Sequence, residues 1–270
     1  MRVDKDEKEF ADWLLKLGEN RLPVFNDDQV EIPKNCHLTK NISEDVFGDI
    51  LRNKEYDKVV KAAILVPTNK QSFLINLQVL NFLEGDVKEY ISYYKAQSNE
   101  DSELKYPQEF LNSIEDAGLP PHKLMLKKNY VVMLLRNLSI QQGLCNGTRL
   151  EVLSMQRNVL ICKILTGDKM GTQIAIPRIP VISNSSNLPM QIIRYQFPLR
   201  LSYAMTINKS QGQTFDRIGV YLEEEVFTHG HLYVAFSRVT SVKGISLFLP
   251  AAKDMGKPTI KNVVFTEVLQ

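Results

Sequence analysis

The sequence predicts an α/β fold in which a parallel sheet with flanking helices is interrupted by a small inserted β-barrel. An apolar run at 61–66 is followed by a polar tip and a helical pattern, which is typical of a buried parallel strand and its crossover helix. Short strands separated by turn signals fill the middle of the chain, and helical and strand patterns alternate again from about 206. We therefore expect a split α/β domain over 1–103 and 198–270, and a β-barrel over 104–197.

The N-terminal third supplies two helices and the first strand-turn-helix unit. A packing helix is predicted over 7–18, because Gly18 is a stop signal and one face carries Phe10, Trp13, Leu14 and Leu17. A connector rich in Pro, Asn and Asp follows at 22–40, and a second helix is predicted from about Ser43 to Asn53.

The strand at 61–66 leads through Thr68 and Asn69 into a predicted helix. Its expected buried face consists of Phe73, Leu74, Leu77, Leu80 and Leu83. This arrangement would place the Thr68 and Asn69 side chains, together with the first backbone N–H groups of the helix, where an anion can bind.

The sequence in the middle of the chain predicts the strands of the barrel, and from about 206 the sequence again has an α/β pattern. After a helix at about 108–114, turns at Asn146-Gly147 and Gly167-Asp168 separate strands predicted within 119–136 and at 150–153, 159–165, 173–176 and near 192. A helix from about Thr206, a strand at 218–222, a helix at 231–239 and a strand at 244–249 complete the prediction.

Positive charge is concentrated where the barrel is expected. Between Ala117 and Thr214 there are 12 Lys or Arg residues against two acidic ones, a net charge of +10, whereas the whole chain is only +2. This basic block indicates a polyanionic partner, although a soluble β domain that uses Lys and Arg as its polar face would look the same. Tyr130 and Tyr195 are candidates for base stacking or, more commonly, for core packing.

Several classes of protein and site are not indicated. No apolar run approaches the roughly 18 to 20 residues that cross a bilayer, and the N-terminus has no secretory signal, so we expect an intracellular protein without membrane contact. The three widely spaced cysteines suit reduced thiols. His229 and His231 have no third ligand in view, so no metal site is expected.

Two C-terminal segments carry the chemistry, at 204–214 and 231–239. The first, from Thr206 to Thr214, brings hydroxyl, amide and Lys groups together after a strand, as phosphate oxygens require, and Gly212 lets the backbone approach closely. The second ends an apolar stem at Arg238. No Gly-x-x-x-x-Gly-Lys-Ser/Thr loop for ATP phosphates and no strand ending in an acidic pair for Mg²⁺ are present.

These two segments, with three others, resemble the C-terminal half of petite-integration-frequency-type helicases, including the Helitron-encoded branch. The other segments are 10–18, 64–69 and the group formed by 119–124, 132–137 and 143–149. The resemblance covers nearly the whole chain. It implies a second RecA-like motor domain with an inserted β domain, which belongs to an ATP-dependent enzyme that moves 5′ to 3′ along single-stranded DNA.

The resemblance also implies roles for individual residues. It places Thr68, Asn69, Thr206, Asn208, Lys209 and Gln211 at the DNA or between DNA and nucleotide, and Gly212 and Gln213 nearer ATP. Arg238 resembles the family's arginine finger, whose planar charge can reach the γ-phosphate. Met1-Arg2 matches the end of a family motif, so Arg2 is a second candidate phosphate contact.

In that family ATP and Mg²⁺ are held mainly by a first RecA-like domain, which we expect to be a missing N-terminal partner of this chain. Alone, the chain is then expected to be nearly inactive as a hydrolase. Expected roles are DNA replication, repair, recombination, telomere maintenance or transposon mobilisation, in the nucleus or in mitochondria. A stand-alone module that binds single-stranded nucleic acid without ATP, and a decayed transposon fragment, remain alternatives; the oligomeric state is left open.

Overall fold

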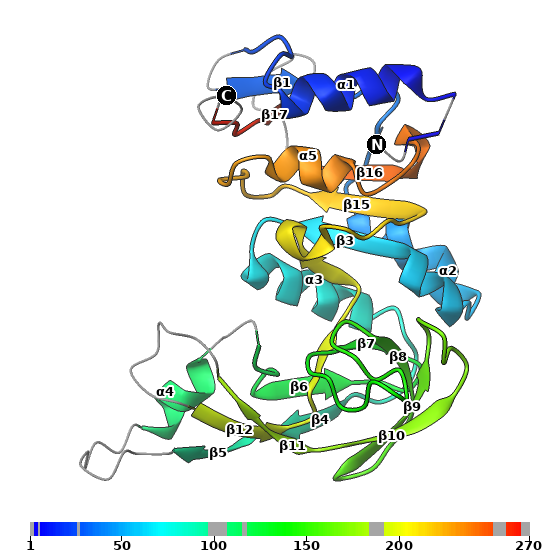
Figure 1. The fold of residues 1–270 in the computed structure, drawn as a ribbon, viewed down its shortest axis with the longest axis vertical. Coiled ribbons are helices and arrows are strands. Elements are labelled where there is room, and N and C mark those ends of the chain that lie inside the picture. The colour runs from blue at the N-terminus through cyan, green and yellow to red at the C-terminus, as the bar shows by residue number, and fades with distance from the viewer. Residues whose placement is uncertain are drawn as a thin grey trace. The chain divides into compact units, whose positions relative to one another are not determined.

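The computed structural model describes residues 3–4, 6–25, 28–96, 107–114, 118–183, 192–250 and 258–265. The chain divides into two compact units (Figure 1). The first, here called the α/β unit, consists of Met1–Phe82 and Tyr203–Gln270, and the second, here called the β unit, is Leu83–Ser202. Arg2 lies outside the described residues.

A five-stranded parallel sheet forms the centre of the α/β unit. Its strand order is β14-β3-β15-β16-β2, and every neighbouring pair is parallel. Strand β3, which lies between β14 and β15, is buried along its whole length, as its uninterrupted apolar sequence predicts. The predicted parallel α/β sheet is therefore confirmed. The strands are β2 His37–Leu38, β3 Ala62–Val66, β14 Ala204–Thr206, β15 Arg217–Tyr221 and β16 Ile245–Phe248.

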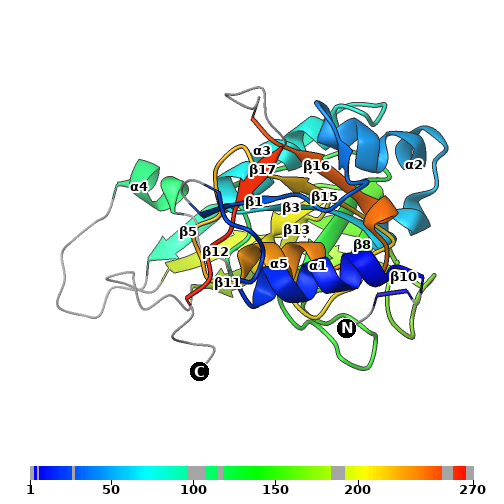
Figure 2. The same ribbon diagram turned by 90° about the horizontal axis from the view of Figure 1, so that it is seen from above.

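Two helices distant in sequence pack together on this unit. Figures 1 and 2 both show α1 (Lys8–Gly18) alongside α5 (His231–Phe236). The rings of Trp13 and Phe236 meet edge to face, with 5.2 Å between centroids. The predicted helix at 7–18 and its buried face are confirmed, since Phe10, Leu14 and Leu17 are in the core. The unit also contains η3 (Tyr56–Lys61), η5 (Val242–Gly244) and a two-stranded sheet of β1 (Gln29–Glu31) with β17 (Thr259–Lys261).

The helix after β3 is present as α3 (Asn69–Leu80), and its predicted buried face is correct only in part, since Leu80 and Leu83 are buried. Phe73 and Leu74 are 45% and 46% exposed. The buried face instead includes the polar residues Gln71, Ser72 and Asn76. Asn76 explains part of this orientation, because its carboxamide receives hydrogen bonds from the backbone N–H groups of Tyr203 and Ala204 (3.0 and 3.1 Å) and donates to the Ala204 carbonyl (2.9 Å). The hydroxyl of Ser72 donates to the same carbonyl at 2.9 Å.

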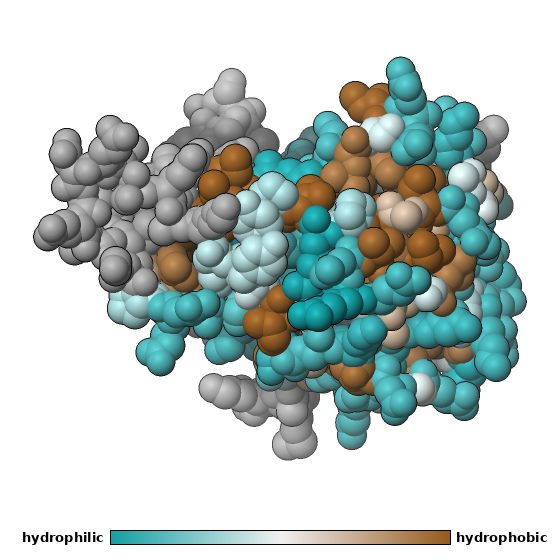
Figure 3. All heavy atoms as spheres, turned by 90° about the horizontal axis from the view of Figure 1, so that it is seen from below, coloured by the Kyte–Doolittle hydropathy of each residue, from teal (hydrophilic) through white to brown (hydrophobic). Residues whose placement is uncertain are grey.

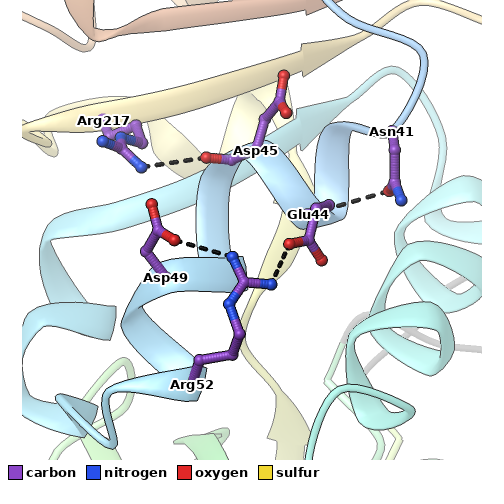
Figure 4. A network of polar contacts seen from close by, with 6 residues as sticks. All are labelled: Asn41, Glu44, Asp45, Asp49, Arg52 and Arg217. Atoms are coloured by element: carbon purple, nitrogen blue, oxygen red, sulfur yellow. Dashed lines mark hydrogen bonds and ion pairs between the residues drawn. The ribbon is translucent and has the colours of Figure 1, made fainter.

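The segment predicted as one helix at 43–53 has two parts, a π-helical turn η2 (Glu44–Gly48) and α2 (Asp49–Arg52). Figure 4 shows its polar contacts: Arg52 pairs with Glu44 and with Asp49, and Asn41 Oδ1 accepts from the Glu44 N–H. Arg217, at the start of β15, donates to the Asp45 carbonyl at 3.0 Å. This last bond attaches η2 to the sheet.

The β unit contains three antiparallel sheets. The largest has the order β10-β9-β8-β7-β13, the second the order β11-β12-β5, and the third pairs β4 with β6. Because the described strands form three sheets rather than one closed sheet, the barrel stays a prediction. The strands are β4 Lys88–Ile91, β5 Tyr93–Ala96, β6 Lys123–Leu126, β7 Val131–Leu134, β8 Arg149–Met155, β9 Val159–Ile164, β10 Gln173–Pro177, β11 Ile179–Ile182, β12 Ile192–Gln196 and β13 Leu199–Leu201.

The β unit begins at Leu83 and ends at Ser202, whereas the sequence predicted an insertion at 104–197. The cause is strand pairing, because β4 pairs with β6, β5 with β12, and β13 with β7. A short helix, α4 (Gln108–Ser113), also belongs to this unit, as predicted.

On the face shown in Figure 3, hydrophobic residues (brown) occur in separate groups among hydrophilic ones (teal). In the part of the chain that the structure describes, no helix is long and apolar enough to span a membrane.

Candidate nucleic-acid interface

The candidate site lies at the carboxyl ends of β3 and β14. These strands are neighbours, with Val66 opposite Thr206. The chain leaves β3 through Thr68 and Asn69, and it leaves β14 through the 3₁₀ turn η4 (Ile207–Ser210). Because parallel strands end at the same edge of a sheet, both polar segments meet there. Lys209 Nζ lies 3.5 Å from Asn69 Oδ1, so two predicted DNA contacts that are distant in sequence are adjacent in space.

Thr68 caps α3, as its position predicts. Its Oγ1 accepts a hydrogen bond from the Gln71 N–H at 3.3 Å. The helix begins at Asn69, so the partial positive charge of its N-terminus lies next to the Lys209 ammonium group. A hydroxyl, a carboxamide, an ammonium group and a helix N-terminus are together suited to bind a phosphate of a nucleic-acid backbone.

The helix predicted from Thr206 is wrong in type and length, because only the 3₁₀ turn η4 forms. Ile207 and Ser210 are buried and anchor this turn, while Gly212 has a φ of +82°, a conformation that glycine adopts without strain. The Gln213 side chain donates to the Lys209 carbonyl at 2.8 Å. The predicted contacts Asn208, Gln211, Gly212 and Gln213 are exposed, and Thr206 and Lys209 are half-buried.

Arg238 connects the two C-terminal segments. It follows α5 and is half-buried. Its Nη1 donates to the carbonyls of Ser210 (3.3 Å) and Gln213 (3.1 Å), and its Nε donates to Val234 O (2.8 Å). The guanidinium therefore holds the loop at 210–213 from one side. This contact places Arg238 beside Gly212 and Gln213, the residues that the resemblance assigns to the nucleotide.

The structure reassigns part of the basic block. Lys127, Arg149 and Arg194 are buried, with exposed fractions of 8%, 4% and 1%. Arg194 donates to three backbone carbonyls (Leu111, Ile114 and Pro120) at 2.7 to 3.0 Å, and Lys127 Nζ donates to Leu83 O at 2.7 Å. These cations stabilise the β unit from inside and do not present their charge to a polyanion. Charge counting along the sequence does not separate such buried cations from surface ones.

The two candidate stacking residues differ. Tyr130 is fully buried, so it is a core residue. Tyr195 stacks on Tyr93 across β12 and β5, with 4.6 Å between the ring centroids, and Tyr93 is 52% exposed. Tyr93 was not among the residues predicted from the sequence, because strand β5 itself was not predicted.

Among the described residues, the pKa shifts of two cysteines and one histidine do not indicate a reactive nucleophile. Burial raises the pKa of the Cys36 and Cys162 thiols to about 12, which disfavours the reactive thiolate. Burial lowers the pKa of His231, and neither of its ring nitrogens has a hydrogen-bond partner among the described residues. Within those residues, no group of three or more His, Cys, Asp or Glu is placed to hold a metal ion.

Sequence comparison finds DNA helicases among the relatives of this chain. Residues 109–155 match a family model described as DNA helicase Pif1, 2B domain. The human ATP-dependent DNA helicase PIF1 is 37% identical over 139 residues, which cover 50% of this chain and 21% of the human protein. The matched region is thus a small part of that relative.

Comparison of structures agrees with the sequence. The Pif1 helicase from Candida albicans has a TM-score of 0.64 and 22% identity, over 98% of this chain and 57% of that one. Bacteroides Pif1 bound to ssDNA has a TM-score of 0.57 and 21% identity, over 92% of this chain and 50% of that one. At these identities the agreement concerns the fold. Taken together, these comparisons show that the chain is similar in sequence and in fold to Pif1 helicases, that residues 109–155 match their 2B domain, and that the chain spans little more than half of the length of these solved structures.

Proposed function

We propose that this chain is the C-terminal part of an ATP-dependent 5′→3′ DNA helicase, and that it grips single-stranded DNA at the carboxyl ends of β3 and β14. The observation that supports this most is the proximity of Lys209 and Asn69, whose side-chain atoms lie 3.5 Å apart at that edge. The proposed DNA contacts are Thr68, Asn69, Thr206, Asn208, Lys209 and Gln211. They are hydrogen-bond donors or charged groups suited to phosphate oxygens, which a sequence-tolerant motor must recognise.

The proposed nucleotide contacts are Gly212, Gln213 and Arg238. In the complete enzyme, ATP and Mg²⁺ would be held mainly by a first RecA-like domain outside these 270 residues. There Arg238 would supply positive charge to the transferring phosphoryl group. Its hydrogen bonds to Ser210 and Gln213 support a link between nucleotide and DNA, since the same loop follows Lys209. Arg2 is proposed as a second phosphate contact on the resemblance alone.

The test is equilibrium binding of the purified chain to a fluorescent single-stranded oligonucleotide over a range of salt concentrations, with and without an ATP analogue. We expect salt-sensitive binding that is indifferent to the analogue, because phosphate contacts release counterions and the first domain is not there to hold ATP. ATP hydrolysis by the chain alone is expected at background level. Lack of binding even at low salt would contradict the proposal and favour a decayed, transposon-derived fragment.

A stand-alone module that binds single-stranded nucleic acid without ATPase activity is the second candidate. It is favoured by the absence of a phosphate-binding loop in the 270 residues. The two candidates predict different results when the chain is fused to the first RecA-like domain of a relative. A helicase half would restore DNA-stimulated ATP hydrolysis that depends on Arg238, whereas a stand-alone binding module would not. A nuclear or mitochondrial location and roles in repair, recombination, telomere maintenance or Helitron mobilisation remain part of this proposal.

A further inference from the structure

The outer face of the β11-β12-β5 sheet carries a row of ring side chains. The three strands lie side by side in Figure 1, and their register places Pro180 of β11, Tyr195 of β12 and Tyr93 of β5 opposite one another. Because directly opposed residues of antiparallel strands point to the same face, the three rings share one face of the sheet. The neighbouring residues Val181 and Arg194 point to the other face and are buried, so the row lies on the side away from the core.

Tyr93 is the accessible end of this row. Its ring is almost parallel to that of Tyr195, with 7° between the planes and 4.6 Å between the centroids, so Tyr195 covers one face of Tyr93. Among the described residues no second ring stacks on Tyr93, β5 is an edge strand of this sheet, and 52% of Tyr93 is exposed. The stack holds the exposed ring in one orientation, and such a ring can receive a further planar group on its open face.

Two guanidinium groups lie near this end of the row. Arg178 Nη1 donates to the carbonyl of Ile91, two residues before Tyr93, at 2.9 Å. Burial lowers the pKa of Arg178, and the phenol groups of Tyr90 and Tyr93 partly oppose this effect. The positive charge of Arg157 also lowers the pKa of Arg178, so the two guanidinium groups repel each other. Among the described residues, the groups that shift this pKa include no carboxylate, which favours an anionic partner for this face.

We propose that the ring of Tyr93 stacks on a base of single-stranded DNA, and that Arg157 and Arg178 attract the phosphates beside that base. An unpaired base offers a flat apolar face and a neighbouring negative charge, which match the open ring and the two cations. In a duplex the faces of the bases are covered by their neighbours, so this contact is specific for a single strand. The inference rests on the function proposed above, and it adds a contact to the base, in the β unit, to backbone contacts in the α/β unit.

The test compares two oligonucleotides of equal length and phosphate number, one of mixed sequence and one fully abasic, in binding to the wild-type chain and to Tyr93→Thr. Threonine removes the ring and suits an exposed position in a strand. We expect Tyr93→Thr to bind the mixed-sequence strand about tenfold more weakly, since stacking of one base on an aromatic ring is worth a factor of this order, and to bind the abasic strand as the wild type does. Tyr93→Phe, which keeps the ring, should bind both strands as the wild type does.

Two further variants separate the ring from the charges. Phe265, in the α/β unit, is a matched control, because it is 54% exposed and its ring stacks on that of His229. Phe265→Ala is expected to leave the affinity for both strands unchanged. Arg157→Ala, at an exposed position, should weaken binding to both strands alike and lower the magnitude of the salt slope by about one, because it removes a phosphate contact. Thermal unfolding of each variant confirms that the chain is folded at the assay temperature.

Three results would overturn the stacking contact. Wild-type affinity of Tyr93→Thr for both strands would show that the ring contacts no base, and would leave this face to a protein partner. Equal weakening for both strands would show an indirect effect on the phosphate contacts. A loss in Tyr93→Phe as large as that in Tyr93→Thr would assign the effect to the hydroxyl group. In each case salt-sensitive binding by the wild-type chain would leave the proposed function standing, whereas a wild-type chain that bound neither strand would contradict both.

Discussion

The Arg238 guanidinium and the Gln213 carbonyl lie 3.1 Å apart, although 25 positions separate them in the sequence. A second bond, to the Ser210 carbonyl, holds the other end of the same loop. Arg238 thus holds the segment that carries Gly212. To reach a γ-phosphate, the Arg238 guanidinium would have to break its hydrogen bonds to the Ser210 and Gln213 carbonyls.

The loop is therefore expected to loosen when Arg238 is changed. Arg238→Ala should accelerate amide hydrogen exchange of 210–215 by roughly tenfold, which corresponds to the loss of about 1.4 kcal/mol of local protection. Arg238→Lys keeps the charge but lacks the planar donor fork, so we expect an intermediate effect. Hydrogen exchange followed by mass spectrometry measures this. Unchanged protection in both variants would contradict a holding role for the guanidinium.

Lys209 is expected to contribute one phosphate contact. Lys209→Ala should weaken binding to single strands of different sequence uniformly and lower the magnitude of the salt slope by about one. Lys58→Ala is a matched control, because it removes the same charge from a surface residue of η3, before the opposite end of β3. If both variants have the same slope, the effect is one of net charge and the site is not at the strand ends.

Asn76 is expected to be a main determinant of stability in the α/β unit. Asn76→Ala leaves the buried N–H groups of Tyr203 and Ala204 without their acceptor, so the free energy of unfolding should fall by about 3 kcal/mol. Lys70→Ala, at an exposed position of the same helix, should change it by less than about 0.5 kcal/mol. Urea unfolding measures both values, and a loss below about 1 kcal/mol for Asn76→Ala would contradict this account.

Gly219 is expected to tolerate no side chain. A Cβ there would lie 2.7 Å from Ile42 Cγ1 and 2.9 Å from Val46 Cγ2, so Gly219→Ala should destabilise the chain by about 1 to 3 kcal/mol through overpacking. The double variant Gly219→Ala with Val46→Ala is expected to recover part of this loss, because it makes room for the new methyl group. The absence of any recovery in urea unfolding would place the cause elsewhere.

Stability is expected to decrease in mild acid because of His231. Burial lowers its pKa in the folded chain below the ordinary value of 6.5, so the unfolded chain binds the proton more readily. Above pH 6.5 His231 is neutral in both the folded and the unfolded chain, so it does not change the free energy of unfolding. As the pH falls from 6.5 to the pKa of His231 in the folded chain, the unfolded chain binds the proton first and the free energy of unfolding decreases. His231→Phe should remove this part of the pH dependence, which is measured by thermal unfolding at several pH values.

The sequence was a good guide where one apolar pattern determines one element. The run at 62–66 could only be a buried strand, and the face of α1 follows from four apolar residues at helical spacing. It was a poor guide where a polar side chain is buried by pairing with a distant backbone. Asn76 and Ser72 turn α3 away from its apolar face, and the acceptor that they share, Ala204 O, lies 128 and 132 positions away.

For the candidate site, the sequence predicted the segments but not their contacts. That Thr68, Asn69 and Lys209 share one edge follows from the parallel pairing of β3 with β14, which the strand patterns alone did not predict. The hydrogen bonds of Arg238 to the 210–213 loop were not predictable, because a lone arginine after a helix has many possible acceptors. The roles of these residues with DNA and ATP stay predictions, and Arg2 lies outside the described residues.

The order of the strands in the central sheet has a consequence for the time course of folding. β3 and β14 are neighbours, yet the whole β unit, Leu83–Ser202, lies between them in the chain. Their pairing therefore closes a very long loop, whereas β8 pairs with β9 and β9 with β10, its neighbours in sequence. Because loop closure opposes distant contacts and local pairing is fast, the β unit should acquire protection from hydrogen exchange first during refolding, and β3 and β14 last.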